Sequence, residues 1–377
     1  MIKILTIIGA RPQIIKAAAL SRAIRTHFPD QIEECLVHTG QHYDTLMSDV
    51  FFQEMDIPCP AYNLGIGSGA HAWQTARMME GIARVLETER PDGLVIYGDT
   101  NSTLAGALAA SKMQVPIFHI EAGLRSFYMP MPEEQNRVVA DHLASICFAP
   151  TQTAMQNLKR EGLTDSPALF TTQRKHRLSI LTGDVMLDNA LHFAPLARQS
   201  DTLKHLNLEA NHYLLATVHR DFNADSADRM DLLLTTLTEL AAETHLPVVI
   251  PAHPRVSGYL SAWTESHRGA SHHLHIIPPA SYLQMLALEQ GAAMILTDSG
   301  GVQKEAYFCQ RPCIILRHET EWKEIVDQGA AILADITPTA IHTAYHQFRT
   351  QPPVYPPLFG DGHAAERIAQ EIIKYLS

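Results

Sequence analysis

The sequence has few cysteines and no long apolar run. Its five cysteines, at positions 35, 59, 147, 309 and 313, form no C-x-x-C pair, and their odd number suits a reducing cytosol. No stretch of eighteen apolar residues occurs. The apolar stretch in the first residues, MIKILTIIGARPQ, is too short for a signal peptide. We therefore expect a cytoplasmic protein with no membrane span.

Basic residues are also scarce, with 29 lysines and arginines against 40 aspartates and glutamates and a net charge of −11. This balance argues against a nucleic acid or an anionic membrane as the main partner. A small anionic ligand is not excluded, because a few convergent arginines reverse the potential locally. We found no internal repeat at solenoid periods and no low-complexity tract.

Two short motifs lack the context that would give them a function. The stretch GIGSGA (65–70) follows no clear strand and fits neither the dinucleotide fingerprint nor the G-x-S-x-G motif. The stretch SHHLH (271–275) has three histidines but no accompanying set of carboxylates or cysteines. We expect neither a metal nor a cofactor.

What the sequence does have is a repeated strand–turn–helix rhythm over 377 residues, a length that favours two domains. Near-continuous apolar strands alternating with amphipathic helices predict parallel sheets covered on both faces. The predicted fold class is α/β, with two Rossmann-like doubly wound domains at 1–185 and 186–362. A Pro-rich connector precedes a last helix at 363–377, which we expect to pack back on the first domain. The predicted strand segments are 2–9, 93–99, 115–123, 145–150, 178–183, 213–220, 247–255, 275–278, 292–298 and 312–317.

Polar residues follow these strands, at the edge where open parallel sheets bind ligands. Each has a bland explanation, such as helix capping or a favourable helix dipole, but so many on one edge indicate a site. The groups are Gly9-Ala10-Arg11, Gly98-Asp99, Glu121, His219-Arg220, His253-Pro254-Arg255, Asp298-Ser299-Gly300-Gly301 and Arg317.

Two of these groups predict anion binding. Arg11 begins a helix, where a cation opposes the helix dipole by about 0.3–1 kcal/mol unless an anion binds there. The segment DSGGVQKEA places Ser299, Gly300 and Gly301 between a strand and a helix, which leaves backbone N–H groups open to a phosphate. Lys16, five residues after Arg11, is either a further anion ligand or a solvated helix lysine.

Taken together, these motifs resemble the non-hydrolysing UDP-N-acetylglucosamine 2-epimerases over nearly the whole chain. The matching segments, in family order, are GARPQIIK, YGDTNSTLAG, HIEAGLRS, MPEEQNR, TGDVMLD, TVHR, HPR and DSGGVQKEA. The resemblance implies a GT-B-like arrangement of two Rossmann-like domains with an interdomain cleft, and a homodimer. It also implies a reaction in which UDP is eliminated to give a 2-acetamidoglucal and is added back after C2 is reprotonated on the other face.

The resemblance also implies roles for individual residues. Asp99, Glu121 and Glu133 become the acid/base candidates, because proton removal from C2 and reprotonation call for carboxylates on both ring faces. His219 assists at the leaving phosphate. The expected ligands of UDP and its diphosphate are Arg11, Lys16, Arg220, His253, Ser299, Gly300, Gly301, Glu305 and Arg317, with Glu305 on the ribose. Glu134 is interpreted as helix support and Arg137 as an i,i+4 partner of Glu133.

Some motifs depart from the common family pattern, namely Gln13 in GARPQ, Tyr43 in QHYD and Trp322 in ETEW. These variants resemble the subgroup that acts on UDP-2,3-diacetamido-2,3-dideoxyglucuronate, so the choice among UDP-2-acetamido sugars stays open. A uronate substrate would require a cation near its carboxylate, for which Arg125 is a candidate. The alternatives are a hydrolysing epimerase, a GT-B glycosyltransferase, for which we find no acceptor site, and a non-enzymatic sensor of nucleotide sugars.

Overall fold

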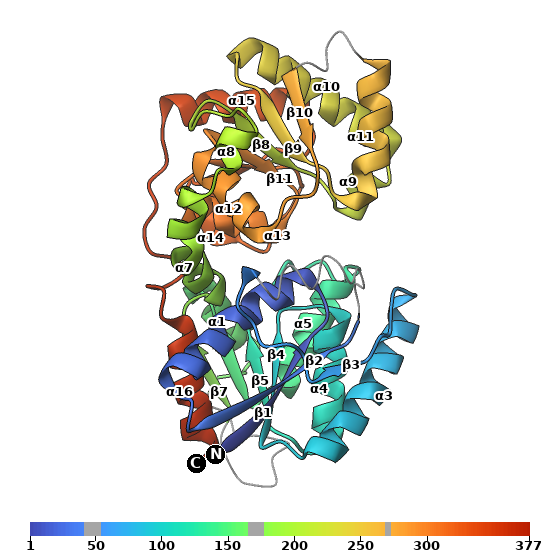
Figure 1. The fold of residues 1–377 in the computed structure, drawn as a ribbon, viewed down its shortest axis with the longest axis vertical. Helices are drawn as coiled ribbons and strands as arrows, with labels where there is room; N and C mark the ends of the chain where they lie inside the picture. The colour runs from blue at the N-terminus through green and yellow to red at the C-terminus, as the bar shows by residue number, and fades with distance from the viewer. Residues whose placement is uncertain (41–53, 165–176, 268–272) are drawn as a thin grey trace. The chain divides into compact units, whose positions relative to one another are not determined.

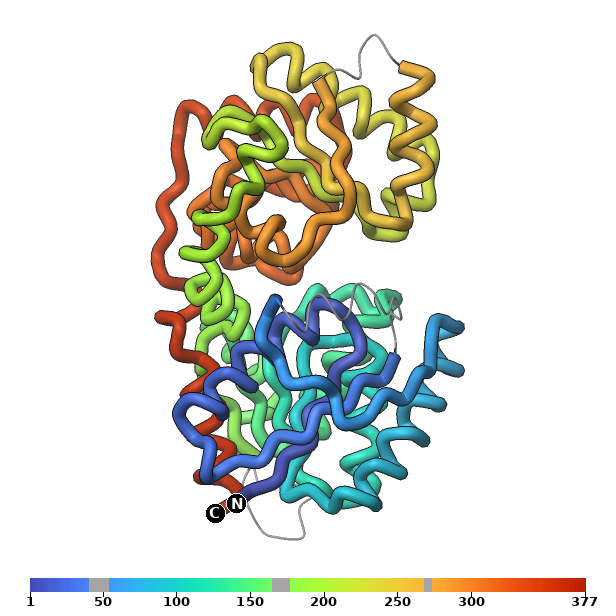
Figure 2. The backbone as a smooth tube through the Cα atoms, viewed as in Figure 1, coloured from blue at the N-terminus to red at the C-terminus, as the bar shows by residue number. Residues whose placement is uncertain are grey.

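The computed structural model describes residues 1–40, 54–164, 177–267 and 273–377. The chain forms two compact units (Figure 1). Unit 1 consists of Met1–Leu191 together with Pro357–Ser377, and unit 2 consists of His192–Pro356. The division falls inside helix α7 (Val185–Gln199). Both chain termini therefore belong to unit 1, where they lie near each other (Figure 2).

Unit 1 is built on a parallel sheet of seven described strands. In spatial order the strands are β3 (Tyr62–Asn63), β2 (Ile32–His38), β1 (Ile2–Ile8), β4 (Gly93–Tyr97), β5 (Ile117–Ile120), β6 (Ile146–Ala149) and β7 (Leu178–Leu181). The chain runs outward in one direction from β1 and in the other from β4. The switch point, where such sheets bind ligands, therefore lies between β1 and β4.

Unit 2 repeats this plan with a parallel sheet of six described strands. In spatial order they are β10 (Leu274–Ile277), β9 (Val248–Pro251), β8 (Leu214–Thr217), β11 (Met294–Thr297), β12 (Cys313–Ile315) and β13 (Ala331–Leu333). Its switch point lies between β8 and β11, so the residues after these strands are the ones placed to meet a ligand.

Helices cover both faces of each sheet. Since parallel crossovers are right-handed, the helices that follow β1 and β4 lie on opposite faces. Besides α7, unit 1 has α1 (Arg11–His27), α3 (His71–Glu89), α4 (Asn101–Lys112), α5 (Pro132–Leu143), α6 (Gln152–Arg160) and α16 (Ala364–Leu376). Unit 2 has α8 (Thr202–His205), α9 (Asp221–Ala224), α10 (Ala227–Thr244), α11 (Pro254–Ser266), α12 (Tyr282–Gly291), α13 (Gly300–Phe308), α14 (Lys323–Asp327) and α15 (Pro338–Thr350). Among the described helices, none is long and apolar enough to cross a membrane.

Gln13 fixes the turn from β1 to α1 against the neighbouring strand. Its Oε1 accepts from the backbone N–H of Ala10 at 3.2 Å, and its Nε2 donates to Tyr97 O at 3.0 Å and to Thr103 Oγ1 at 3.1 Å. A glutamate at this position has no donor for the last two bonds. The glutamine therefore joins β1, β4 and α4 directly at the switch point.

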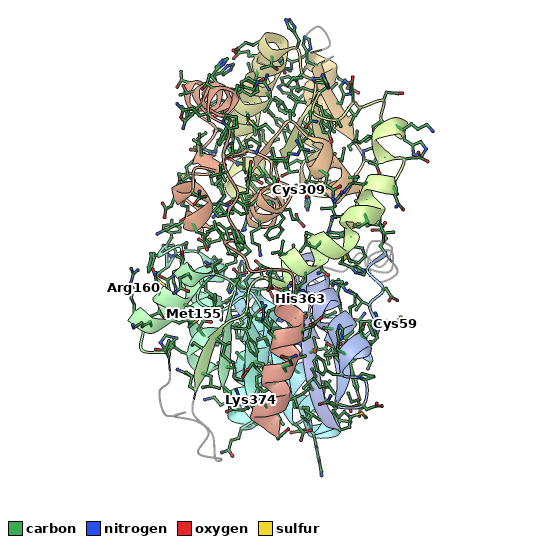
Figure 3. The ribbon with its side chains drawn as sticks, turned by 90° about the vertical axis from the view of Figure 1, so that its left-hand side faces the viewer. Cys59, Met155, Arg160, Cys309, His363 and Lys374 are labelled. Atoms are coloured by element: carbon green, nitrogen blue, oxygen red, sulfur yellow. The ribbon has the colours of Figure 1, made fainter. Side chains whose placement is uncertain are left out.

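The last helix belongs to unit 1, where it contacts α1. Asp188 caps its start by accepting from the N–H groups of Ala364 and Ala365 at 3.2 and 2.7 Å. Near its end, the ring of Tyr375 meets that of Phe118 on β5 edge to face, with centroids 5.7 Å apart. Figure 3 shows this helix between His363 and Lys374. Its apolar stripe completes the core on this face of the sheet.

Candidate active site

The end of β4 requires a glycine. Gly98 has a φ of +60°, and a Cβ there would lie 3.0 Å from Nζ of Lys16 and 3.3 Å from Oε1 of Glu121. A side chain would therefore be strained and would also crowd both charged groups. The glycine allows the chain to turn into Asp99 while Glu121, from the end of β5, comes close to it.

Lys16 and Glu121 form a buried ion pair, with Nζ 2.5 Å from Oε1. Glu121 also has a left-handed backbone, with a φ of +67°. Backbone strain at a residue that is not glycine is concentrated at functional sites, where the surrounding structure holds it. The structure thus places Lys16, which the sequence suggested as a diphosphate ligand, on a carboxylate of unit 1.

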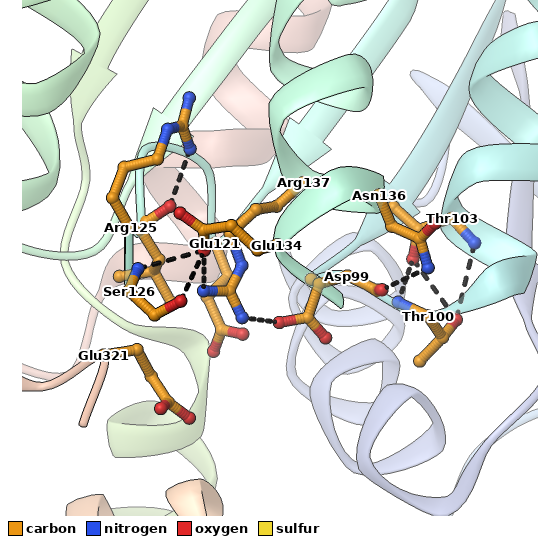
Figure 4. A network of polar contacts seen from close by, with 12 residues as sticks. Asp99, Thr100, Thr103, Glu121, Arg125, Ser126, Glu134, Asn136, Arg137 and Glu321 are labelled. Atoms are coloured by element: carbon orange, nitrogen blue, oxygen red, sulfur yellow. Dashed lines mark hydrogen bonds and ion pairs between the residues drawn. The ribbon is translucent and has the colours of Figure 1, made fainter. Parts of the chain in front are cut away.

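Asp99 lies in a second ion pair, which Figure 4 shows. The guanidinium of Arg137 donates to Oδ2 of Asp99 and, at 2.8 Å, to Oε2 of Glu134. Asn136 donates to the backbone oxygen of Asp99 at 2.9 Å. The sequence predicted an i,i+4 pair with Glu133, whereas the structure pairs Arg137 with Glu134 and with Asp99, and so connects α5 to the end of β4.

Glu134 is buried and anchors the loop before α5. Its carboxylate accepts from N and Oγ of Ser126, both at 3.0 Å, and from N of Phe127 at 2.9 Å. Phe127 has a φ of +63°, which these bonds hold in place. Glu134 therefore does more than support its helix, the role that the sequence predicted, because it also fixes the loop before α5. Its neighbour Glu133 is half-buried in the first turn of the same helix.

Beneath the carboxylates lies a fully buried network around Asp141 of α5. Asp141 Oδ1 is 2.7 Å from Nδ1 of His119, and its Oδ2 accepts from Gly123 N at 3.1 Å and from Arg125 Nη1 at 2.7 Å. Burial alone would raise the pKa of Asp141, but its bonds with His119 and Arg125 hold that pKa below its usual range. The carboxylate is therefore ionised in the folded protein.

Arg125 bonds two carboxylates of the protein. Besides Asp141, it meets both carboxylate oxygens of Glu161 at 2.7 Å. Burial lowers the pKa of its guanidinium, but the bonds from Glu161 and Asp141 outweigh burial and raise the pKa. The sequence suggested this arginine as the partner of a substrate carboxylate, and the structure instead gives its charge to two protein carboxylates.

In unit 2, Asp298 holds the turn that follows β8. Its buried carboxylate accepts from the backbone N–H of His219 at 3.1 and 3.2 Å and from that of Arg220 at 3.0 Å. Asn223 joins the same carboxylate to Leu316 O, each at 3.1 Å. Nδ1 of the partly exposed His219 is 3.8 Å from Oδ1 of Asp298. This aspartate therefore sets the position of His219 across the switch point.

The start of α13 already has an internal anion beside it. Ser299 is the N-cap residue, without a side-chain cap bond, and Gly300 and Gly301 form the first turn. A Cβ on Gly300 would lie 2.2 Å from Oε1 of Glu321. Oε2 of Glu321 lies 3.0 Å from Nη1 of Arg317. Glu321 thus lies beside Gly300 and pairs with Arg317, two of the residues that the sequence assigned to a diphosphate.

The other predicted UDP ligands lie on or just before helices of their own units. His253 is the N-cap residue of α11, and its ring stacks on that of His219 with centroids 5.2 Å apart. Glu305 is buried on α13, where Lys304 lies with Nζ 4.4 Å from the centre of the Trp322 ring. Arg11, in unit 1, is the half-buried first residue of α1.

Two segments singled out from the sequence fall wholly or partly outside the described residues: QHYD (41–44) and 271–272 of SHHLH. Within the described ranges, no group of three or more His, Cys, Asp or Glu side chains could hold a metal ion.

Three residues of these sites carried no role in the sequence prediction. His119 had one signal, because it is a polar residue inside the apolar run IFHI. Asp141, on a helix more than twenty residues later, had none, and Glu321 lies in the ETEW segment, in which the sequence pointed only to Trp322. Their partners are distant in sequence, so only the folded chain brings them together.

Two doubly wound units, with paired carboxylates at one switch point and a glycine-rich helix start at the other, define an α/β enzyme. The chain belongs to the UDP-N-acetylglucosamine 2-epimerase family, whose model matches residues 25–373. The family and the fold class predicted from the sequence are therefore confirmed.

Individual relatives match the chain almost end to end. It is 43% identical to the UDP-N-acetylglucosamine 2-epimerase homolog of Methanococcus maripaludis, over 98% of both chains. It is also 43% identical to the UDP-2,3-diacetamido-2,3-dideoxy-D-glucuronate 2-epimerase of Pseudomonas aeruginosa, over 99% of both. The crystal structure of the Methanocaldococcus jannaschii UDP-GlcNAc 2-epimerase in complex with UDP-GlcNAc and UDP matches with a TM-score of 0.88 and 37% identity, covering 99% of this chain and 100% of that one.

Proposed function

We propose that this protein epimerises C2 of UDP-linked 2-acetamido sugars without net hydrolysis. The observation that carries the proposal is the group of carboxylates in unit 1, where Glu121 is paired with Lys16 and Asp99 with Arg137. Paired acids of this kind can take a proton from one carbon and return it. The family, and the substrates in the names of the two relatives at 43% identity, support the same reaction.

The reaction begins with removal of the C2 proton, while the bond from C1 to the UDP oxygen breaks. The electron pair of the C2–H bond becomes the C1–C2 double bond of a 2-acetamidoglucal, and UDP leaves with the electrons of the C1–O bond. Re-addition of UDP to C1 and protonation of C2 on the opposite face give the epimer. We assign Asp99, Glu121 and Glu133 to these proton transfers.

Departure of UDP needs stabilisation, because the C2 proton is weakly acidic and a base alone is too slow. We assign this task to unit 2, with Ser299, Gly300, Gly301 and Arg317 at the diphosphate and His219 at the leaving oxygen. Asp298 supports the assignment, since it holds the His219–Arg220 turn through backbone bonds. The remaining assigned contacts to UDP are Arg11, Lys16, Arg220, His253 and Glu305.

Two substrates are in question, UDP-GlcNAc and its 2,3-diacetamido-glucuronate congener. The departures at Gln13 and Trp322 favour the congener, and we propose it as the better substrate. Gln13 acts indirectly, through its bonds at the turn between β1 and α1. Arg125 is not assigned to the uronate carboxylate, because Asp141 and Glu161 already hold it.

The test is incubation of the protein with each substrate in heavy water, followed by proton and phosphorus NMR. Deuterium at C2 and a UDP-linked epimer are the expected results, with faster exchange for the diacetamido uronate. Free sugar plus UDP would instead identify a hydrolysing epimerase, and unchanged substrate with transfer to an added acceptor would identify a glycosyltransferase. Efficient exchange with UDP-GlcNAc alone would reverse the substrate assignment.

We further propose a homodimeric, cytoplasmic enzyme that supplies sugars for surface polysaccharides. The dimer rests on the resemblance to the family. The cytoplasm is supported by the five cysteines, all of which lie in the described ranges and carry free thiols. Light scattering at micromolar concentration tests the dimer, and a monomeric mass would contradict it.

A further inference from the structure

His119 contacts elements that carry each of the three carboxylates. It lies on β5, two residues before Glu121, and its Nε2 is 2.7 Å from the backbone oxygen of Gly98, the residue before Asp99. Its Nδ1 is 2.7 Å from Asp141, which lies on α5, the helix that also carries Glu133. One buried ring thus joins the end of β4, the end of β5 and α5.

The two bonds define the state of the ring. A backbone oxygen only accepts hydrogen bonds, so Nε2 must carry a hydrogen. Asp141 is an ionised carboxylate whose other oxygen already accepts from Gly123 and Arg125, so Nδ1 must carry one as well. A neutral imidazole has one N–H and leaves one of these acceptors unsatisfied in a fully buried place.

The charges around the ring allow this state. Facing it are Asp141 from α5 and Cys147, its register partner on β6, with Arg125 and Glu161 one bond further out. Burial raises the pKa of the Cys147 thiol well above its usual range, so that group is neutral. The imidazolium and guanidinium are then balanced by two carboxylates, as buried charges require.

We propose that His119 is a positioning residue, held as an imidazolium by Asp141 and Gly98, that fixes the mutual placement of Asp99, Glu121 and Glu133. The inference rests on the proposed function, because it concerns the same carboxylates. It adds a residue that touches no substrate and acts through the Gly98 peptide and α5.

The protonation state is tested first, on the unaltered protein. With ¹⁵N-labelled histidine, NMR distinguishes an imidazolium from both neutral tautomers, and the His119→Gln spectrum identifies the signal. We expect the His119 signal to show a hydrogen-bonded N–H at both nitrogens, one to Asp141 and one to the Gly98 oxygen. A single protonated nitrogen in that signal would overturn the proposal, whether or not any variant is active.

The positioning role is tested with His119→Gln and Asp141→Asn. His119→Gln removes the ring that makes both hydrogen bonds, and Asp141→Asn removes the carboxylate charge beside Nδ1. Each substitution leaves the side-chain size nearly unchanged. Misplacement of catalytic groups by about 1 Å can cost about 10²-fold, so we expect kcat to fall by that order with little change in KM. Affinity for UDP should change little by calorimetry, because the residues assigned to the diphosphate, Ser299, Gly300, Gly301 and Arg317, lie in unit 2.

Glu34→Gln is the matched control. It neutralises a carboxylate of the same unit that lies on β2 and accepts from Thr6 Oγ1, so kcat should stay near that of the unaltered protein. Unchanged kcat in both His119→Gln and Asp141→Asn would overturn the positioning role, as would equal losses in the Glu34 control. If the unaltered protein itself fails to exchange the C2 proton, the proposed function is wrong, which is a distinguishable result.

Discussion

Nζ of Lys16 on α1 lies 2.5 Å from Oε1 of Glu121 at the end of β5, and both side chains are at least nine-tenths buried. The pair joins the helix after β1 to the strand two places away in the sheet. Each side chain thus has an opposite partner in a place from which water is largely excluded.

The first prediction concerns the stability of this pair. Lys16→Met should lower the free energy of unfolding by about 3–5 kcal/mol, because it leaves the Glu121 carboxylate buried without its ammonium partner. The double variant with Glu121→Gln should recover much of that loss. Denaturant unfolding measures both, and a double variant as unstable as the sum of the single ones would contradict the pairing.

The second prediction concerns the acid/base assignment. Asp99→Asn, Glu121→Gln and Glu133→Gln should each reduce turnover by about 10²–10⁴-fold, the range for loss of a general acid or base. UDP binding should survive in each variant. Glu87→Gln, an exposed residue of α3, is the control. Near-normal turnover in all three variants would contradict their assignment as acid/base residues.

The third prediction compares two adjacent glycines of α13. In Gly300→Ala the new methyl would lie 2.2 Å from Glu321 Oε1, so the carboxylate that pairs with Arg317 must shift. We expect about 1–3 kcal/mol of destabilisation, as for other overpacked sites, and weaker UDP binding.

Gly301→Ala is the matched control, since its methyl would meet only Ser299 Oγ, at 3.8 Å, within 4 Å. Alanine reduces the conformational entropy of the unfolded chain there, so the free energy of unfolding should rise by about 0.4–1 kcal/mol. Equal stability of the two alanine variants in thermal unfolding would contradict the crowding at Gly300.

The fourth prediction concerns pH. Burial raises the pKa of Glu34 on β2 above its ordinary value of 4.5, although Thr6 Oγ1 donates to it at 2.8 Å. Folding therefore favours the protonated acid, and the carboxylate costs stability at every pH above the folded-state pKa. Glu34→Gln should stabilise the protein at pH 8.

That gain should shrink as the pH falls through the folded-state pKa towards 4.5, because the glutamate of the unaltered protein then becomes neutral too. Unfolding free energies at a series of pH values measure it. A gain that stays constant with pH would show that charge is not its cause. Glu33→Gln, the exposed neighbour, should change stability little.

The sequence by itself determined the fold class and the family. Strands such as β4 and β11 are continuous apolar runs that end at a glycine or a polar residue, and this local pattern is visible without a structure. It also located the strand ends at which Asp99, Glu121 and His219 lie, because in parallel sheets these residues share one edge.

Tertiary structure decided which charges meet. Arg137 was expected to pair with Glu133 but bonds Glu134 and reaches Asp99, 38 residues away. Lys16 reaches Glu121 across 105 residues. Arg125 was a candidate for a substrate carboxylate, but it bonds the buried Asp141 and the partly exposed Glu161 instead. The physical reason is that periodicity and capping act within a few residues, whereas a buried charge is stabilised by whichever opposite charge the folded chain brings within hydrogen-bonding distance.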